Sequence, residues 1–248
     1  MHKKVALLIA IVLGVMIHSS FRKGTGTLTA DDSLRLLYSK SPSEWPKPTI
    51  DPGIKWSELG TLPPSPVVAH KDSLKNIIEL GRILFYDPRL SVSNQISCIS
   101  CHAPDMNWAD GRQVSLGHNQ ATTARNSPAL ENVWFFKKLF WDGRVNSLED
   151  QLNGPISSAN EMHGDMKSLP NKLSKIKGYL PLFTAAYGEN KITQKRIAKA
   201  LATYELSFTS RKSDFDYFLE GNTKRLTDQQ IEGLHLFRTK ARCMNCHN

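Results

Sequence analysis

Two pentapeptides of the form C-x-x-C-H use every cysteine in this 248-residue chain. One spans residues 98–102 (CISCH) and the other spans residues 243–247 (CMNCH). Such a pentapeptide is the attachment signature of a c-type haem, because its two thiols bond the porphyrin vinyl groups and its histidine binds the iron. A single C-x-x-C pair would equally fit a redox or zinc site. Two full copies favour two covalently bound haems c. Because the two motifs lie far apart in the sequence, a single zinc site built from both is disfavoured.

The predicted haem-binding residues follow directly from the two motifs. They are Cys98, Cys101 and His102 in the first motif, and Cys243, Cys246 and His247 in the second. The two histidines are the expected proximal ligands of the haem irons.

The N-terminus predicts export. A basic stretch at residues 2–4 precedes an uninterrupted apolar run from Val5 to Ile17. That run is shorter than the roughly 17–25 residues of a membrane span and fits the apolar region of a signal peptide. We therefore expect residues 1–24 to be a signal peptide or a retained N-terminal membrane anchor, and the protein to reside in the periplasm.

Composition limits the range of partners. The chain is 40% hydrophobic with a net charge of +9, as expected for an ordinary globular protein. Lysine is dense between Lys167 and Lys199, which predicts either a solvated face or a docking patch for an acidic partner. The basic residues form no recognised motif and are not interleaved with aromatic residues, so no nucleic-acid partner is expected.

The pattern of apolar residues predicts a mainly α fold, with cytochrome c-like haem domains and long loops. Helices are expected to begin near Asp72 or Ser73, at Thr193, and at a capping box formed by Thr227 and Gln230. Convincing alternating strands are absent from the sequence. Residues 25–71 are rich in proline and predict an irregular arm that wraps the domain.

His118 is a candidate second ligand for the first haem. It follows Gly117, which permits a tight turn back over the haem. Spacing alone leaves two interpretations open, a solvated loop histidine and a distal ligand.

Further motifs carry a family resemblance. They are LGRILFYDPRLS at residues 80–91, SLGH at 115–118, RNSP at 125–128, FWDGR at 140–144, EM at 161–162, FD at 215–216 and GLHLF at 233–237. In order and spacing, residues 72–248 resemble the bacterial di-haem cytochrome c peroxidases, a family that includes the MauG-like enzymes.

The resemblance implies a role for each matching residue. His118 corresponds to a removable distal ligand of a peroxidatic, low-potential haem, and Glu161 to a distal acid–base with Gln151 as a polar neighbour. Trp141 matches a tryptophan that bridges the two haems, although an ordinary core aromatic is the alternative. Asn126 matches a ligand of a calcium ion between the haems. The second haem would be the high-potential electron acceptor, whose reduction frees His118.

The resemblance also implies an activity. We expect a peroxidase that reduces hydrogen peroxide with electrons from a small donor, either a c-type cytochrome or a cupredoxin, with a homodimer as an allowed assembly. Two alternatives stay open: a non-catalytic di-haem electron carrier and a MauG-like oxidase of a protein substrate. His118 favours the peroxidase over the oxidase, and Glu161 favours it over the carrier.

The chain departs from the family pattern at its end. It stops at Asn248, whereas family members continue and supply the axial methionine of the second haem. We therefore expect a fragment, with residues 72–225 as the peroxidatic haem domain and 226–248 as the start of an incomplete second haem domain. A second haem that works differently is the alternative.

Overall fold

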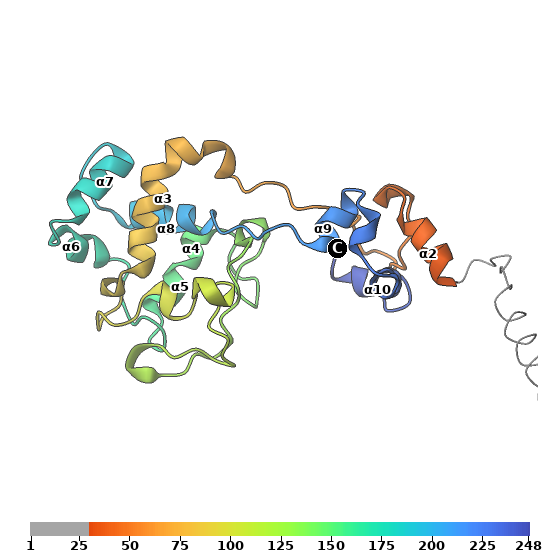
Figure 1. The fold of residues 1–248 in the computed structure, drawn as a ribbon. Helices are drawn as coiled ribbons and strands as arrows, with labels where there is room; N and C mark the ends of the chain where they lie inside the picture. Colours follow the sequence, from red (N-terminus) through yellow and green to blue (C-terminus); the bar gives the residue numbers. More distant parts are fainter. Residues whose placement is uncertain (1–29) are drawn as a thin grey trace, which may run out of the picture. The chain divides into compact units, whose positions relative to one another are not determined.

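The computed structural model describes residues 30–248, which form two compact units (Figure 1). Unit 1 joins the N-terminal residues up to Thr61 with Lys212–Asn248, and unit 2 is the continuous segment Leu62–Arg211. The predicted signal or anchor segment, residues 1–24, lies outside the described residues. The unit boundaries fall at 61/62 and 211/212. The predicted bounds of the two haem domains, 72–225 and 226–248, stay predictions.

Unit 2 is built on one long helix and its neighbours. Its helices are α3 (Lys71–Tyr86), α4 (Leu148–Gln151), α5 (Asn153–Ser157), α6 (Leu169–Ser174), α7 (Tyr179–Tyr187) and α8 (Gln194–Glu205). Helix α3 packs chiefly against α8 and also against α7 (Figure 1). The contact with α8 is close at Gly81, where an added Cβ would lie 2.0 Å from the backbone oxygen of Ala200. Glycine therefore sets the distance between these two helices.

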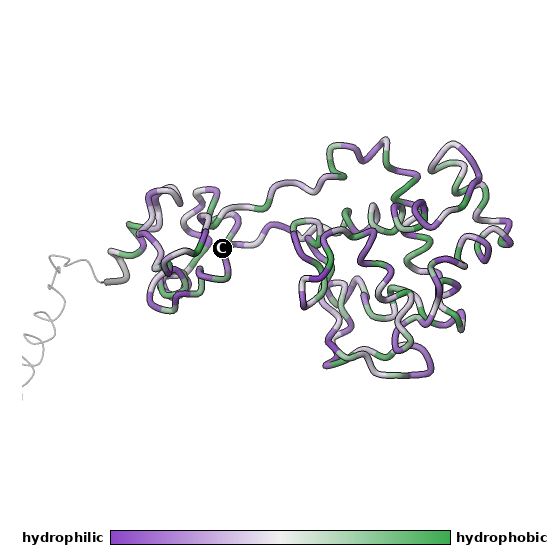
Figure 2. Tube along the Cα trace, turned by 180° about the vertical axis from the view of Figure 1, so that it is seen from behind, coloured by the Kyte–Doolittle hydropathy of each residue, from purple (hydrophilic) through white to green (hydrophobic). Residues whose placement is uncertain are grey.

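The core of unit 2 contains a cluster of aromatic rings between the helices and the loop that follows the first C-x-x-C-H motif. Trp108 and Phe208 stack with ring centroids 3.7 Å apart and an angle of 10° between planes. Phe85 and Tyr204 meet both of these rings edge-on. Hydrophobic residues (green) and hydrophilic residues (purple) alternate along both the helices and the loops of this unit (Figure 2). The cluster fixes one wall of the region that carries Cys98.

Two of the three predicted helix starts are confirmed. Thr193 caps α8 by accepting a hydrogen bond from the backbone N–H of Arg196 at 3.2 Å, and Thr227 forms the predicted capping box of α10 (Asp228–Arg238). The third predicted start, at Asp72 or Ser73, is wrong by one or two residues. Helix α3 begins at Lys71 with no side-chain cap, so Asp72 lies inside its first turn, where its negative charge favours the helix terminus.

In the part of unit 1 that the structure describes, three α-helices surround a small core. Helices α2 (Ala30–Tyr38) and α9 (Asp214–Leu219) accompany α10, and α2 contacts α10. The prediction of a wholly irregular arm over residues 25–71 is therefore wrong at α2. The proline-rich stretch begins only after that helix, and Tyr38 is buried in the core as its last residue.

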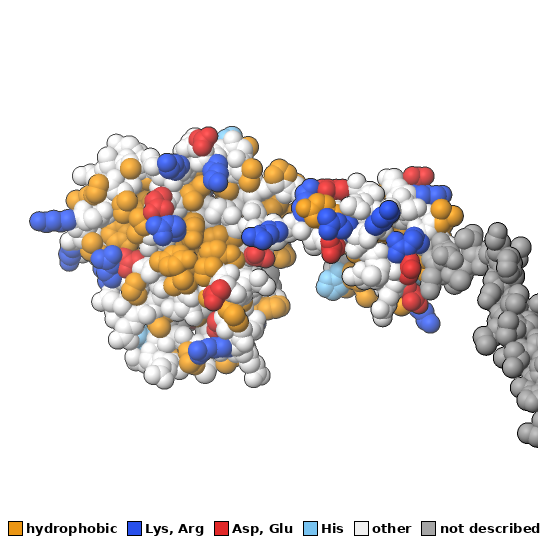
Figure 3. Space-filling model, in the orientation of Figure 1, with side chains coloured by type: hydrophobic (Ala, Val, Ile, Leu, Met, Phe, Trp, Pro, Cys, Tyr) orange, Lys and Arg blue, Asp and Glu red, His pale blue; other side chains and the backbone are white. Residues whose placement is uncertain are grey.

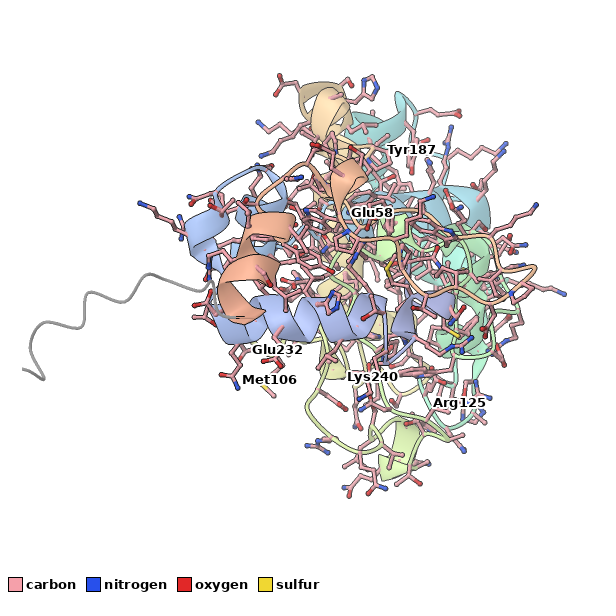
Figure 4. All side chains as sticks on the ribbon, turned by 90° about the vertical axis from the view of Figure 1, so that its right-hand side faces the viewer. Glu58, Met106, Arg125, Tyr187, Glu232 and Lys240 are labelled. Atoms are coloured by element: carbon pink, nitrogen blue, oxygen red, sulfur yellow. The ribbon has the colours of Figure 1, made fainter. Side chains whose placement is uncertain are left out.

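A buried arginine joins the arm to α10 within unit 1. Arg238 is fully buried and forms an ion pair with Glu58, which is labelled in Figure 4. Its guanidinium also donates to the backbone oxygen of Pro46 at 2.8 Å and lies over the rings of Tyr38 and Trp45. Burying a charge is costly unless it is paired, and these contacts provide the pairing.

The predicted mainly α class is confirmed. Among residues 30–248 no strand forms, and three isolated antiparallel bridges close loops of unit 2 instead. Within that same range, no helix combines the length and the hydropathy that crossing a bilayer requires.

Candidate haem sites and distal residues

The first C-x-x-C-H motif folds into a single tight turn. Residues Cys98–Ser100 form a 3-10 helix, and the backbone N–H groups of Cys101 and His102 both donate to the oxygen of Cys98, at 3.2 and 3.0 Å. Ser97 and Ser100 close the start of the turn as a capping box. Both thiols are free. One short element thus presents two thiols and one imidazole, the set that a c-type haem needs.

The imidazole of His102 is fixed by its neighbours. Its Nδ1 lies 2.8 Å from the backbone oxygen of Trp108, and because a carbonyl only accepts, Nδ1 carries the proton. The hydroxyl of Ser127 donates to the oxygen of Cys101 at 2.9 Å and lies 3.3 Å from the same Nδ1. Burial lowers the pKa of His102, which favours the neutral ring. Its Nε2 is thereby left as the basic nitrogen for a metal.

The environment of the two thiols disfavours their thiolate form. Burial raises the pKa of the Cys98 thiol, and the nearby charge of Glu205 raises it further. Burial likewise raises the pKa of the Cys101 thiol, to which the charges of Asp110 and Glu161 add. Thiolates are therefore disfavoured here, unlike at a catalytic cysteine or a zinc site.

A loop carrying His118 packs against the segment that carries Glu161. The backbone N–H of His118 donates to the backbone oxygen of Glu161 at 2.7 Å. At Gly117 an added Cβ would lie 2.1 Å from the backbone oxygen of Asn160, so this approach requires glycine. The predicted pair, a distal histidine and a carboxylate, is thus brought together by the backbone.

Glu161 lies in a partly buried position near the first haem-attachment turn. Burial raises the pKa of its carboxyl group, whereas a hydrogen bond with Ser158 and the charge of Arg144 lower it. Its charge also raises the pKa of the Cys101 thiol.

The structure adds a residue to this pair that the sequence did not indicate. The ring of His163 meets the ring of His118 edge-on, with centroids 4.9 Å apart and planes at 74°. The Nδ1 of His118 is buried and makes no hydrogen bond to any described residue. Only the tertiary fold reveals this contact, because residues 118 and 163 are far apart in the sequence.

The remaining predicted site residues lie elsewhere in unit 2. The indole N–H of Trp141 donates to the backbone oxygen of Asn126 at 3.0 Å, and Arg125, labelled in Figure 4, pairs with Asp142 at 3.4 Å. Trp141 is 64% exposed, so the alternative of an ordinary core aromatic is wrong in this structure. Gln151 ends α4, and no hydrogen bond between described residues joins its side chain to Glu161. The calcium ligand at Asn126 and the roles of Trp141 and Gln151 stay predictions.

The second motif repeats the turn of the first. The backbone N–H groups of Cys246 and His247 donate to the oxygen of Cys243 at 3.1 and 2.9 Å, and both thiols are free. Within unit 1, Met244 is buried, whereas Cys246 and His247 are exposed. The two motifs therefore share local geometry and differ in how far their own unit encloses them.

The residues present fit a haem at the first turn. The donor set is complete, His102 is oriented through Nδ1, and the unpaired Nδ1 of His118 lies buried in the loop beside Glu161. Hydrophobic side chains also gather on the face of unit 2 seen in Figure 3, over the region of α4 and α5, as an apolar porphyrin requires. The sequence did not single out two neighbours of this turn. They are Ser127 of the RNSP motif, which contacts His102, and Glu205, whose charge raises the pKa of the Cys98 thiol.

Comparisons with known proteins agree with this geometry. The family model described as di-haem cytochrome c peroxidase matches residues 75–224, more than half of the chain. The methylamine utilization protein MauG of Methylophilus methylotrophus is 39% identical over 171 residues, which are 68% of this chain and 51% of the relative. Cytochrome c551 peroxidase of Pseudomonas aeruginosa is 37% identical over 172 residues, or 68% of this chain and 49% of the relative.

Solved structures give the same result. A MauG-like protein associated with microbial copper homeostasis superposes with a TM-score of 0.62 at 29% identity, covering 74% of this chain and 54% of that one. This chain spans about half the length of the curated relatives that it matches. The chain is thus a member of the di-haem cytochrome c peroxidase family, an oxidoreductase family with two covalently bound c-type haems.

Proposed function

We propose that this protein reduces hydrogen peroxide to water in the periplasm, with electrons from a small c-type cytochrome or a cupredoxin. The reaction consumes two electrons and two protons for each peroxide and yields two waters. A haem bound at Cys98, Cys101 and His102 would supply the iron and the redox chemistry.

The observation that carries this proposal is the hydrogen bond from the backbone N–H of His118 to the backbone oxygen of Glu161. Through this bond, the loop that carries a candidate distal histidine lies against the segment that carries a carboxyl group able to transfer protons. A protein that only carries electrons has no need of a distal acid, so the pair supports peroxide chemistry over simple electron transfer.

Each residue then has a defined task. His102, held by the backbone oxygen of Trp108, would bind the haem iron. His118 would be the second, removable ligand, whose departure admits peroxide. The Glu161 carboxylate takes the proton from one peroxide oxygen and delivers it to the other, which favours loss of water.

A MauG-like oxidation of a partner protein is the second candidate. Two MauG proteins are 39% and 36% identical to this chain, an identity comparable to that of the peroxidases. The difference lies in where the electrons come from: a small redox donor in the peroxidase, and side chains of the partner in the oxidase.

Electron counting separates the candidates. The chain is produced with both haems attached, and hydrogen peroxide is added with a reduced small cytochrome in excess. We expect two cytochromes oxidised for each peroxide consumed. Peroxide consumption without cytochrome oxidation would reject the peroxidase and support the oxidase, and no peroxide consumption by the di-haem form would leave only electron transfer.

A further inference from the structure

The two histidines of the first haem region are held in opposite ways. A histidine that ligates a metal usually donates its other ring N–H to an acceptor, which fixes the ring. His102 follows this pattern through the oxygen of Trp108 at 2.8 Å. His118 does not, because its Nδ1 is buried without a hydrogen bond to any described residue. Something else must therefore hold the His118 ring.

The ring of His163 is in the position to do so. It is the aromatic ring that contacts His118 in the described part of the chain, edge-on at a centroid distance of 4.9 Å. The edge-on geometry places the positive rim of one ring against the negative face of the other, which is attractive.

The backbone around His163 forms a rigid support. The N–H groups of Glu161 and His163 both donate to the oxygen of Ser158, at 3.1 and 2.9 Å, and that of Gly164 donates to the oxygen of Ile156 at 2.7 Å. His163 itself adopts a φ of 48°, in the left-handed region that is uncommon for residues with a side chain but in which histidine, like asparagine and aspartate, is enriched. These hydrogen bonds hold the backbone that carries the ring in contact with His118.

The backbone of His118 is fixed as well, so its ring is the part that can move. Its N–H is bonded to Glu161, and Gly117 leaves no space for the loop to shift toward Asn160. Rotation of the His118 side chain would break one aromatic contact and no hydrogen bond. The contact with His163 therefore opposes the departure of His118.

We propose that His163 is a positioning residue that holds the His118 ring in its inward orientation and so sets how readily His118 leaves the distal side of the first haem. This inference rests on the role that the proposed function gives to His118. It adds the residue that adjusts the equilibrium between the ligated and the released histidine.

Three substitutions at His163 separate ring packing from other effects. His163→Phe keeps an aromatic edge and loses both nitrogens. His163→Asn and His163→Gly remove the ring and suit the left-handed backbone, so each protects the fold. His118→Ala defines the spectrum of a first haem that has lost this ligand.

The measurement uses the full chain with both haems attached. Electronic absorption and electron paramagnetic resonance spectra report the share of six-coordinate, low-spin haem at the first site, and the rate of cyanide binding reports how often the distal side is free. We expect His163→Gly and His163→Asn to raise the released share and the cyanide-binding rate by about two- to tenfold, as loss of one aromatic pair implies. His163→Phe should remain close to the parent protein.

Two results would overturn the inference while leaving the proposed function intact. One is a parent-like spectrum and cyanide-binding rate for both ring-less variants, when His118→Ala does lose the low-spin signal. The other is a His163→Phe protein that behaves like His163→Gly. If His118→Ala keeps the low-spin signal of the parent, His118 is not the ligand, and both the proposed switch and this inference fail.

Discussion

At the scale of single residues, the distal side depends on one carboxyl group. Glu161 is partly buried, and its main chain accepts the hydrogen bond that positions His118. Substitution to glutamine preserves size and the backbone contact while removing the group that moves protons.

We expect Glu161→Gln to keep both haems and to slow peroxide turnover about 100- to 10,000-fold, the usual contribution of a general acid–base. Turnover is measured with a reduced cytochrome donor, and haem content by absorption of the pyridine complex. Glu79→Gln on the exposed side of α3, where Glu79 pairs with Arg82, is the matched control. Equal turnover in Glu161→Gln and the control would remove Glu161 from the mechanism.

A second carboxyl group, that of Glu205, is buried and forms no ion pair with any described residue. Glu205 is 4% exposed, and burial together with the charge of Glu149 raises its pKa to about 8 from a usual value of 4.5. The folded protein therefore binds this proton more tightly than the unfolded chain. Binding of this proton adds to the free energy of unfolding. The contribution is complete below about pH 4.5 and is lost as the pH rises through about 8.

We expect Glu205→Gln to match the parent protein near pH 5 and to exceed it in free energy of unfolding above pH 8. The gain is on the order of a few kcal/mol, because one pKa unit corresponds to about 1.36 kcal/mol. Urea unfolding of the haem-bound protein across this pH range measures the effect. A constant difference between the two proteins at all pH values would contradict the assignment.

Sequence patterns reached some of these residues and not others. His118 and Glu161 sit in motifs whose roles a family resemblance supplies. His163 and Glu205 become notable only through contacts with distant segments, a ring 4.9 Å away and a charge near the Cys98 thiol. Local sequence contains no signal for either contact.

At the scale of elements, α3 and α8 set the frame of unit 2. The predicted start of α8 was confirmed because a threonine cap is a local feature, settled by one side chain and one N–H. Helix α2 was missed because the prolines that follow Tyr38 outweighed the apolar spacing of Leu34, Leu37 and Tyr38 in the sequence. The close approach at Gly81 depends on a partner helix and could not be predicted from α3 alone.

We expect Gly81→Ala to destabilise the protein by about 1–3 kcal/mol, because the new methyl group forces α3 away from the backbone of Ala200. Chemical denaturation with fluorescence detection measures this change. Gly233→Ala in α10 is the matched control: its Cβ would meet nothing within 4 Å, and alanine favours a helix by about 1 kcal/mol over glycine. Equal effects of both substitutions would show that Gly81 does not set the helix distance.

At the scale of the whole molecule, two haem turns with the same backbone geometry lie in different units. Because each turn is closed by hydrogen bonds to the oxygen of its own first cysteine, both should be competent for attachment.

We expect the intact mass of the chain, produced in an exporting host with haem-attachment machinery, to exceed that of the polypeptide by two haems. Serine at both Cys98 and Cys101 should remove one haem, and serine at both Cys243 and Cys246 should remove the other. A single haem in the parent protein that persists in the second variant would mean that the turn at Cys243 is not loaded.

The two units also differ in the order in which a chain that emerges N-terminus first completes them. Unit 2 is one continuous stretch, so all of its helices can meet as soon as Arg211 has emerged. Unit 1 joins residues on both sides of unit 2, so α2 emerges before all of unit 2 and its partner α10 emerges after it. Until then Tyr38 and Trp45 lack the surface that buries them. The arm must therefore wait until all of unit 2 has emerged, and in that interval its apolar side chains are open to aggregation and proteolysis.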